Sequence, residues 1–287
     1  MSSDAPAQPP PMLVSEHRPL PVELHPNIDH IVTEDGAPVD NQFSEKQQRL
    51  LAEVLYGSWQ PGEPFVAMSN VGLFFAIRTP PFFPDVLVSL GVASPADPFP
   101  KKNRSYFVWE YGKPPDLVVE IVSNEEGGED TVKLQGYAKL GITFYIIYDP
   151  EEHLSSKPLR VYRLVSGRYE LDQSESPFLE SLGLGVRIWH GVYEDMSQAW
   201  LRWTTADGQI MPTGKERAIA EEQRAGKEQQ RTLVEKQRAD DEKQRADDER
   251  QRANDEKQRA DAEAKRANEA EREALRLKEK LRQLGID

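Results

Sequence analysis

The composition of the chain changes abruptly near residue 213, and this break limits what each part can fold into. Residues 1–213 are rich in Pro, aromatic and branched aliphatic residues, whereas residues 214–287 consist almost entirely of Glu, Asp, Lys, Arg, Gln and Ala. Because a core needs large apolar side chains, only the first part has the composition of a globular domain. We therefore expect a largely disordered Pro-rich segment over 1–40, one domain over 41–213 and a helical tail over 214–287.

The tail repeats every seven residues from Glu235 onward, and a single small residue holds the apolar position of each repeat. A stable coiled coil needs large apolar residues at two positions per heptad, so this pattern predicts a long solvated helix that self-associates weakly, if at all. Two interpretations stay open: an arm for oligomerisation or tethering, and a charge-laced helix with no fixed partner. The repeated position is occupied by Ala239, Ala246, Ala253, Ala260, Ala267, Ala274 and then Leu281.

The net charge of −13 lies entirely on the first part of the chain. Residues 1–213 hold 16 Lys and Arg against 29 Asp and Glu, while residues 214–287 hold 20 of each kind. An acidic domain of this kind argues against a broad basic surface for nucleic acid, because phosphate contacts dominate such binding. A small cationic strip is still present at Lys101, Lys102 and Arg104.

The absence of certain residues excludes several classes of protein. The sequence has no Cys, which excludes disulfides, cysteine nucleophiles and zinc sites built on thiolates. No apolar run approaches the length that a membrane-spanning helix needs, and the N-terminal residues lack the pattern of a signal peptide. We therefore expect a cytoplasmic protein with no membrane partner.

The domain reads as a mixture of helices and short strands. A helix is expected from Ser44, with Ser44 and Gln47 as a capping box, and a second one over 130–140. The segments 65–68 and 71–75 are expected to pair as a β-hairpin across Ser69 and Asn70. Further strands are expected at 86–88, 106–109, 117–122, 144–148, 159–164, 168–171 and 186–189. This order predicts a mixed α/β fold.

Two acidic residues stand out because each is attached to a short apolar strand. Asp85 precedes Val86-Leu87-Val88, and Glu120 interrupts the run from Leu117 to Val122. A carboxylate inside such a strand costs free energy to bury, so it persists where something compensates its charge. Two carboxylates that converge from neighbouring strands are what a Mg²⁺ site requires. The alternative for Pro84-Asp85 is a turn at the start of a strand.

These segments also carry a resemblance to a known family. The chain resembles the Uma2 family, which belongs to the PD-(D/E)XK nuclease superfamily, over about residues 40–205. The resemblance implies a nuclease-like mixed sheet with flanking helices. It rests on Phe83-Pro84-Asp85-Val86, on Pro115-Asp116-Leu117-Val118-Val119-Glu120-Ile121-Val122-Ser123, on Asp130, Lys133, Tyr137 and Gly141, and on Tyr145 and Asp149-Pro150.

The resemblance implies roles for three residues. Asp85 and Glu120 correspond to the family's metal-binding acids, with Mg²⁺ or Mn²⁺ as cofactor. The superfamily's Lys two residues after the second acid is replaced here by Val122, and Lys133 on the following helix is the family's counterpart. The segment 124–128 departs from the family pattern, and Glu45 is a further acid that could either serve the metal or cap its helix.

Two functions follow. The first is a metal-dependent endonuclease that hydrolyses DNA phosphodiester bonds with Asp85, Glu120 and Lys133, where DNA as the partner comes from the resemblance. The second is a non-catalytic, nuclease-like scaffold that acts through its C-terminal helix in protein–protein association.

Overall fold

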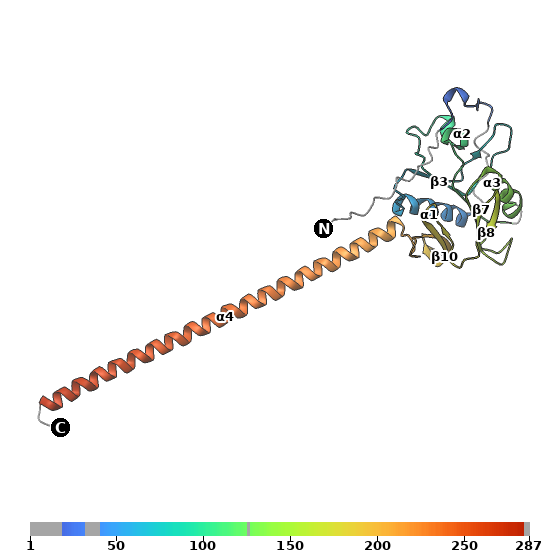
Figure 1. Ribbon diagram of the computed structural model, residues 1–287. Coiled ribbons are helices and arrows are strands. Elements are labelled where there is room, and N and C mark those ends of the chain that lie inside the picture. The colour runs from blue at the N-terminus through green and yellow to red at the C-terminus, as the bar shows by residue number, and fades with distance from the viewer. Residues whose placement is uncertain (1–18, 32–40, 125–126, 284–287) are drawn as a thin grey trace, which may run out of the picture. The chain divides into compact units, whose positions relative to one another are not determined.

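The protein is described by a computed structural model over residues 19–31, 41–124 and 127–283 (Figure 1). The chain divides into two compact units, residues 1–217 and 218–287. All strands of the described residues belong to the first unit. In chain order the elements are η1 (Val22–Leu24), α1 (Gln42–Ser58), β1 (Phe65–Ser69), β2 (Leu73–Phe74), β3 (Val86–Leu90), η2 (Lys101–Asn103), β4 (Tyr106–Phe107), α2 (Val108–Tyr111), β5 (Leu117–Ile121), the π-helical turn η3 (Glu129–Lys133), α3 (Leu134–Leu140), β6 (Phe144–Tyr148), β7 (Leu159–Val165), β8 (Arg168–Leu171), β9 (Phe178–Leu179), β10 (Leu184–Tyr193), β11 (Met196–Thr204) and α4 (Gly214–Gln283).

A six-stranded mixed sheet organises the first unit. Its strand order is β1-β3-β5-β6-β7-β8, and smaller sheets are formed by β11-β10-β9 and by β2-β4. Within the large sheet β5 and β6 run parallel, and the other neighbours run antiparallel. Every residue of β5 and β6 is buried, as expected for central strands covered on both faces. The predicted class, a mixed α/β sheet with flanking helices and a long C-terminal helix, is confirmed.

The two faces of the sheet bury different clusters of apolar side chains. Leu117, Val119 and Ile121 of β5 join the cluster that contains the apolar side of α1 and the β10–β11 hairpin. Val118 and Val122 join the cluster that contains Tyr137 of α3. Successive side chains of β5 therefore point to opposite faces of the sheet, as the geometry of a strand requires. Glu120 shares its face with Val118 and Val122.

The first helix begins earlier than the sequence predicts. It starts at Gln42, and the side chain of Asn41 caps it by accepting a hydrogen bond from the backbone N–H of Ser44 at 2.8 Å. The capping box of Ser44 and Gln47 is therefore wrong. Gln47 is buried and pairs with the backbone of Leu201, at 3.0 Å to its carbonyl and 2.9 Å from its N–H. The side-chain amide of Gln47 is buried, so it pairs with the backbone N–H and C=O of Leu201 on β11 and does not cap the start of the helix.

The predicted hairpin of 65–68 with 71–75 is also wrong. β1 pairs along its whole length with β3, from Phe65 opposite Leu90 to Ser69 opposite Val86. Asn70 then turns the chain out of the sheet with a positive φ of 53°, and β2 pairs in parallel with β4. Five paired residues satisfy more backbone groups than the two residues of β2 offer, so the more distant partner is preferred.

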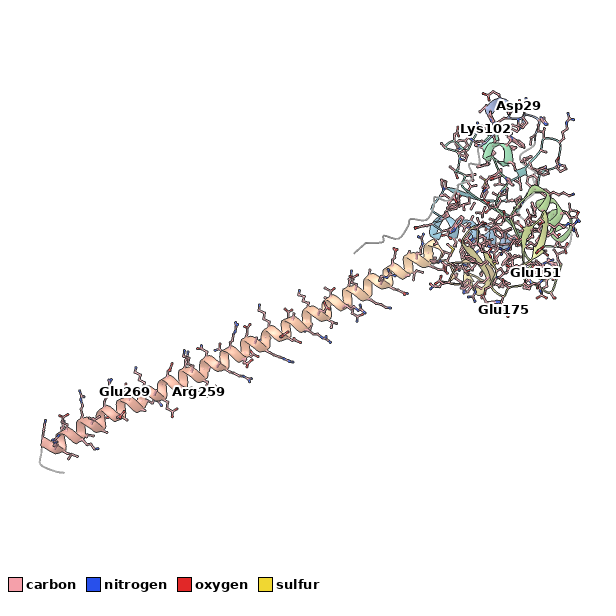
Figure 2. The ribbon with its side chains drawn as sticks, in the orientation of Figure 1. Asp29, Lys102, Glu151, Glu175, Arg259 and Glu269 are labelled. Atoms are coloured by element: carbon pink, nitrogen blue, oxygen red, sulfur yellow. The ribbon has the colours of Figure 1, made fainter. Side chains whose placement is uncertain are left out.

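Part of the N-terminal segment lies against the domain. Of the segment 1–40, which the sequence predicts to be largely disordered, the structure describes residues 19–31, and the rest of the prediction lies outside the described residues. Within residues 19–31, Leu20 donates its N–H to the carbonyl of Trp109 at 3.2 Å. Nζ of Lys101 donates a hydrogen bond to the carbonyl of Asp29 at 2.8 Å. Asp29 and Lys102, the neighbour of Lys101 in the sequence, are labelled in Figure 2. The cationic strip at 101–104 therefore also anchors this segment.

The second unit consists of α4 from Ala218 onward. The whole of α4 spans 70 residues, which corresponds to about 105 Å at a rise of 1.5 Å per residue. None of its described side chains is buried, and charged residues such as Arg259 and Glu269 occur along its length (Figure 2). Leu275, Leu277 and Leu281 are exposed. No described helix is both long enough and apolar enough to cross a membrane.

We expect the full chain and a truncation to residues 1–217 to have the same oligomeric state at micromolar concentration. One small apolar residue per heptad buries too little surface to hold two helices together. The truncation ends after Arg217 because Glu216 pairs with the buried Arg202 at 2.7 Å and must be kept. Size-exclusion chromatography with light scattering measures both masses. A dimer formed by the full chain alone would contradict this expectation and identify the helix as an assembly arm.

Candidate active site

The register of the sheet places Asp85 and Glu120 opposite each other. Val86 of β3 pairs with Val119 of β5 in an antiparallel ladder, so the next pair outward is Asp85 with Glu120. Asp85 directly precedes β3, and Glu120 lies one residue before the end of β5. The two acids, 35 positions apart in the sequence, therefore lie at the same end of neighbouring strands.

Asp85 connects α1 to the central strand. Its Oδ1 accepts a hydrogen bond from Nε2 of Gln48 at 2.6 Å, and its Oδ2 accepts one from the backbone N–H of Ile121 at 2.6 Å. Its own carbonyl accepts the N–H of Asn70 at 3.0 Å. Asp85 thus contacts the residue that follows Glu120. Its carboxylate accepts hydrogen bonds from both α1 and β5, which a turn at Pro84-Asp85 alone would not require.

Glu120 is buried, with 2% of its surface exposed. Its Oε1 accepts a hydrogen bond from the hydroxyl of Tyr137 at 2.6 Å, and its Oε2 lies 3.0 Å from Nζ of Lys133. Burial raises the pKa of Glu120 to about 8, although the Lys133 ammonium opposes this rise and the charge of Asp85 adds to it. The negative charge at this position is therefore only partly compensated by the protein.

Lys133 lies between two carboxylates. Besides Glu120, it contacts Oε1 of Glu129 at 2.9 Å. Burial lowers the pKa of Lys133, but the two carboxylates outweigh burial and hold the pKa above its usual value. Lys133 therefore remains a cation at neutral pH, which suits electrostatic stabilisation of an anion and excludes a role as general base in this arrangement.

Three further residues join this cluster. Gln48 is a polar residue on the buried side of α1, and Tyr137 follows Lys133 by one helical turn. Of these two positions, Tyr137 had a signal in the sequence, because it belongs to the spacing that carries the family resemblance, whereas Gln48 had none. Glu129 had none, because a charged residue at the start of a helix ordinarily faces solvent.

Glu45 does not reach the cluster. Its carboxylate lies 3.1 Å from Arg49 on the exposed side of α1, and the residue of this helix that contacts Asp85 is Gln48. Asp149 is completely buried and accepts hydrogen bonds from the N–H groups of His153 and Leu154, so it shapes the loop after β6.

The donor set suits a hard divalent cation. Asp85 and Glu120 supply carboxylate oxygens, and oxygen ligands are those that Mg²⁺ prefers. Within residues 19–31, 41–124 and 127–283, no group of three or more His, Asp or Glu side chains has the arrangement to hold a metal ion. A cation held by these two carboxylates would take water or substrate as its other ligands, as is usual for Mg²⁺.

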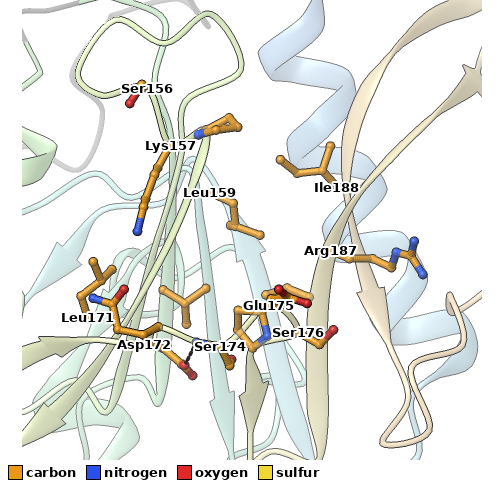
Figure 3. Close-up of a pocket in the computed structure, with 15 residues that line it drawn as sticks. Ser156, Lys157, Leu159, Leu171, Asp172, Ser174, Glu175, Ser176, Arg187 and Ile188 are labelled. Atoms are coloured by element: carbon orange, nitrogen blue, oxygen red, sulfur yellow. Dashed lines mark hydrogen bonds between the residues drawn. The ribbon is translucent and has the colours of Figure 1, made fainter.

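A separate hollow of about 560 Å³ lies between the β7–β8 pair and β10 (Figure 3). Lys157, Asp172, Glu175 and Arg187 are among the residues that line it. Neither the two acids nor Lys133 lines it, so the acid cluster is distinct from this hollow.

Comparison with known proteins places the chain in a family. The family model Uma2, described as "Putative restriction endonuclease", matches residues 24–188, which is more than half of the chain. Among curated proteins none matches. A solved structure described as a putative nuclease belonging to DUF820 from Anabaena variabilis is similar, with 17% identity and a TM-score of 0.35 over 51% of this chain and 78% of that one. The chain belongs to the Uma2 family.

Proposed function

We propose that the protein is a divalent-cation-dependent endonuclease that hydrolyses phosphodiester bonds in DNA. The observation that carries the proposal is the buried Glu120 in contact with Lys133 and opposite Asp85 in the sheet. The buried Glu120 and the half-buried Asp85, beside a lysine held as a cation, match the charges that phosphodiester hydrolysis requires. DNA as the substrate is supported by the description of the Uma2 family model, "Putative restriction endonuclease".

Each residue of the cluster has a distinct part in this proposal. Asp85 and Glu120 would hold Mg²⁺ or Mn²⁺, which when bound supplies an activated water and neutralises phosphate charge. Gln48 and the N–H of Ile121 orient Asp85, and the Tyr137 hydroxyl orients Glu120. Lys133 supplies a fixed positive charge beside the scissile phosphate, because its two carboxylate partners keep it protonated.

The test is the relaxation of supercoiled plasmid DNA by the purified full chain. Nicked circles are expected with Mg²⁺ or Mn²⁺, and EDTA should prevent their formation. An RNA of matched length, tested in parallel, measures the preference for DNA. Plasmid that stays supercoiled across a range of cation and salt concentrations would contradict the proposal. The salt concentration is varied because the acidic residues of the first part of the chain repel the phosphates of DNA.

A non-catalytic role is the second candidate, and the observation that favours it is α4. From Ala218 onward, none of the described side chains of this helix is buried, so this part of the chain forms no core of its own. The truncation to residues 1–217 separates the two candidates, because catalysis should survive it and a scaffold function should not.

A further inference from the structure

Glu129 is a buried carboxylate that the proposed chemistry leaves without a role. It is 6% exposed, and its Oε1 contacts Lys133 at 2.9 Å. Its Oε2 is buried and has no hydrogen-bond partner among the described residues. A charged oxygen in this position is costly to bury, so a protein keeps one where it serves a purpose.

The backbone around Glu129 is shaped to turn this carboxylate inward. A Cβ added at Gly127 would lie 2.0 Å from Oε1 of Glu129, so the carboxylate rests directly against that glycine. Gly128 has a positive φ of 69°, and the N–H of Lys133 reaches its carbonyl at 3.0 Å in a π-helical turn. Such turns are rare and occur frequently at functional sites. The hydroxyl of Tyr145 fixes the turn further through the carbonyl of Glu129 at 2.9 Å.

Lys133 is shared between Glu129 and Glu120, and the two contacts are nearly equal in length. The Nζ atom lies 2.9 Å from Glu129 and 3.0 Å from Oε2 of Glu120. If Glu120 holds a divalent cation, that cation and the ammonium repel each other at the same carboxylate. Lys133 then needs a second anion to remain in the site.

We infer that Glu129 is a positioning residue that retains Lys133 in the site when Glu120 binds a divalent cation. This inference rests on the proposed function, since it takes Glu120 as a cation ligand. Glu129 touches neither the cation nor the substrate in this account; it acts through Lys133. Without it, Lys133 would be held by Glu120 alone and would compete with the cation for that carboxylate.

A double-mutant cycle on the full chain tests this inference, with Mn²⁺ binding measured by calorimetry. Glu129→Gln should weaken Mn²⁺ binding by about tenfold, the lower end of what outer-shell partners contribute. Lys133→Met should not weaken binding, because it removes the competing ammonium. In the Lys133→Met background, Glu129→Gln should change the affinity by less than about twofold, as expected when one residue acts only through the other.

A conservative variant and a control complete the cycle. Glu129→Asp keeps the charge but shortens the reach to Lys133, so it should reproduce much of the loss seen with Glu129→Gln. Asp130→Asn removes a neighbouring charge whose carboxylate lies 3.8 Å from Arg160, and it should leave Mn²⁺ affinity unchanged. Circular dichroism verifies that each variant is folded.

Two results would overturn the inference and leave the proposed function intact. An equal loss from Glu129→Gln in both backgrounds would mean that Glu129 acts on the cation directly, and no loss in either would mean that it has no part in cation binding. Failure of the unaltered chain to bind Mn²⁺ would instead contradict the proposed function, and this inference with it.

Discussion

Replacing Glu120 with glutamine is expected to lower cation-dependent DNA cleavage by roughly 10³-fold or more. Glutamine has almost the same shape and can still accept the Tyr137 hydrogen bond, but it lacks the charge that holds a divalent cation. A bound cation supplies several kcal/mol of transition-state stabilisation, and about 1.4 kcal/mol corresponds to a tenfold change in rate. The measurement is the initial rate of plasmid nicking at saturating Mg²⁺, with thermal unfolding followed in parallel.

Glu45→Gln is the matched control for this experiment. It removes one negative charge from the same unit, and its carboxylate pairs with Arg49 on an exposed surface. It should cleave at the rate of the unaltered chain. A Glu120→Gln variant that cleaves as fast as this control would assign the activity to another part of the molecule or to a contaminant.

The second large effect concerns stability and pH. The pKa of Glu120 is about 8 in the folded protein, well above the ordinary value of 4.5 that applies when the chain is unfolded. The folded state therefore binds this proton more tightly, and its contribution to stability is fully present below pH 4.5. That contribution is lost as the pH rises through 8. At about 1.4 kcal/mol for each pKa unit, the loss is roughly 3–5 kcal/mol.

Glu120→Gln should remove this part of the pH dependence, because glutamine does not titrate. As the pH rises from 5 to 9, the difference in unfolding free energy between the variant and the unaltered chain should shift by roughly 3–5 kcal/mol in favour of the variant. Urea unfolding followed by Trp fluorescence measures the difference, since all five Trp residues lie in the first 217 residues and α4 has none. Parallel pH profiles for the two proteins would show that Glu120 ionises in the folded state much as it does in the unfolded chain.

The central strands and the burial of Glu120 could be predicted from the sequence because local pattern decides them. The apolar runs 117–122 and 144–148 allow few other structures than buried strands, and alternation along 117–122 correctly assigns Glu120 to one face. A charge in such a run is itself a signal, because its burial must be compensated. The second helix is likewise marked by Gly141, which ends it in the left-handed conformation.

The features that could not be predicted depend on contacts between distant residues. The choice of β3 over β2 as the partner of β1 depends on competition between pairings, and no local pattern reveals it. Gln48 and Glu129 have the composition of surface positions, and they are buried only because Asp85 and Lys133 lie where the folded sheet and turn place them. The sequence predicts the segment 130–140 as one helix, and it does not predict the π-helical turn at Glu129–Lys133.

The account depends on one divalent cation held jointly by Asp85 and Glu120. Calorimetric titration of the full chain with Mn²⁺ above pH 8, where Glu120 is ionised, tests this most directly. The account predicts a single-site isotherm that is lost in Asp85→Asn and, separately, in Glu120→Gln, and that is retained in Glu45→Gln. Undiminished Mn²⁺ binding in either of the first two variants would contradict it, because a shared ion cannot keep its affinity after losing one of its two carboxylates.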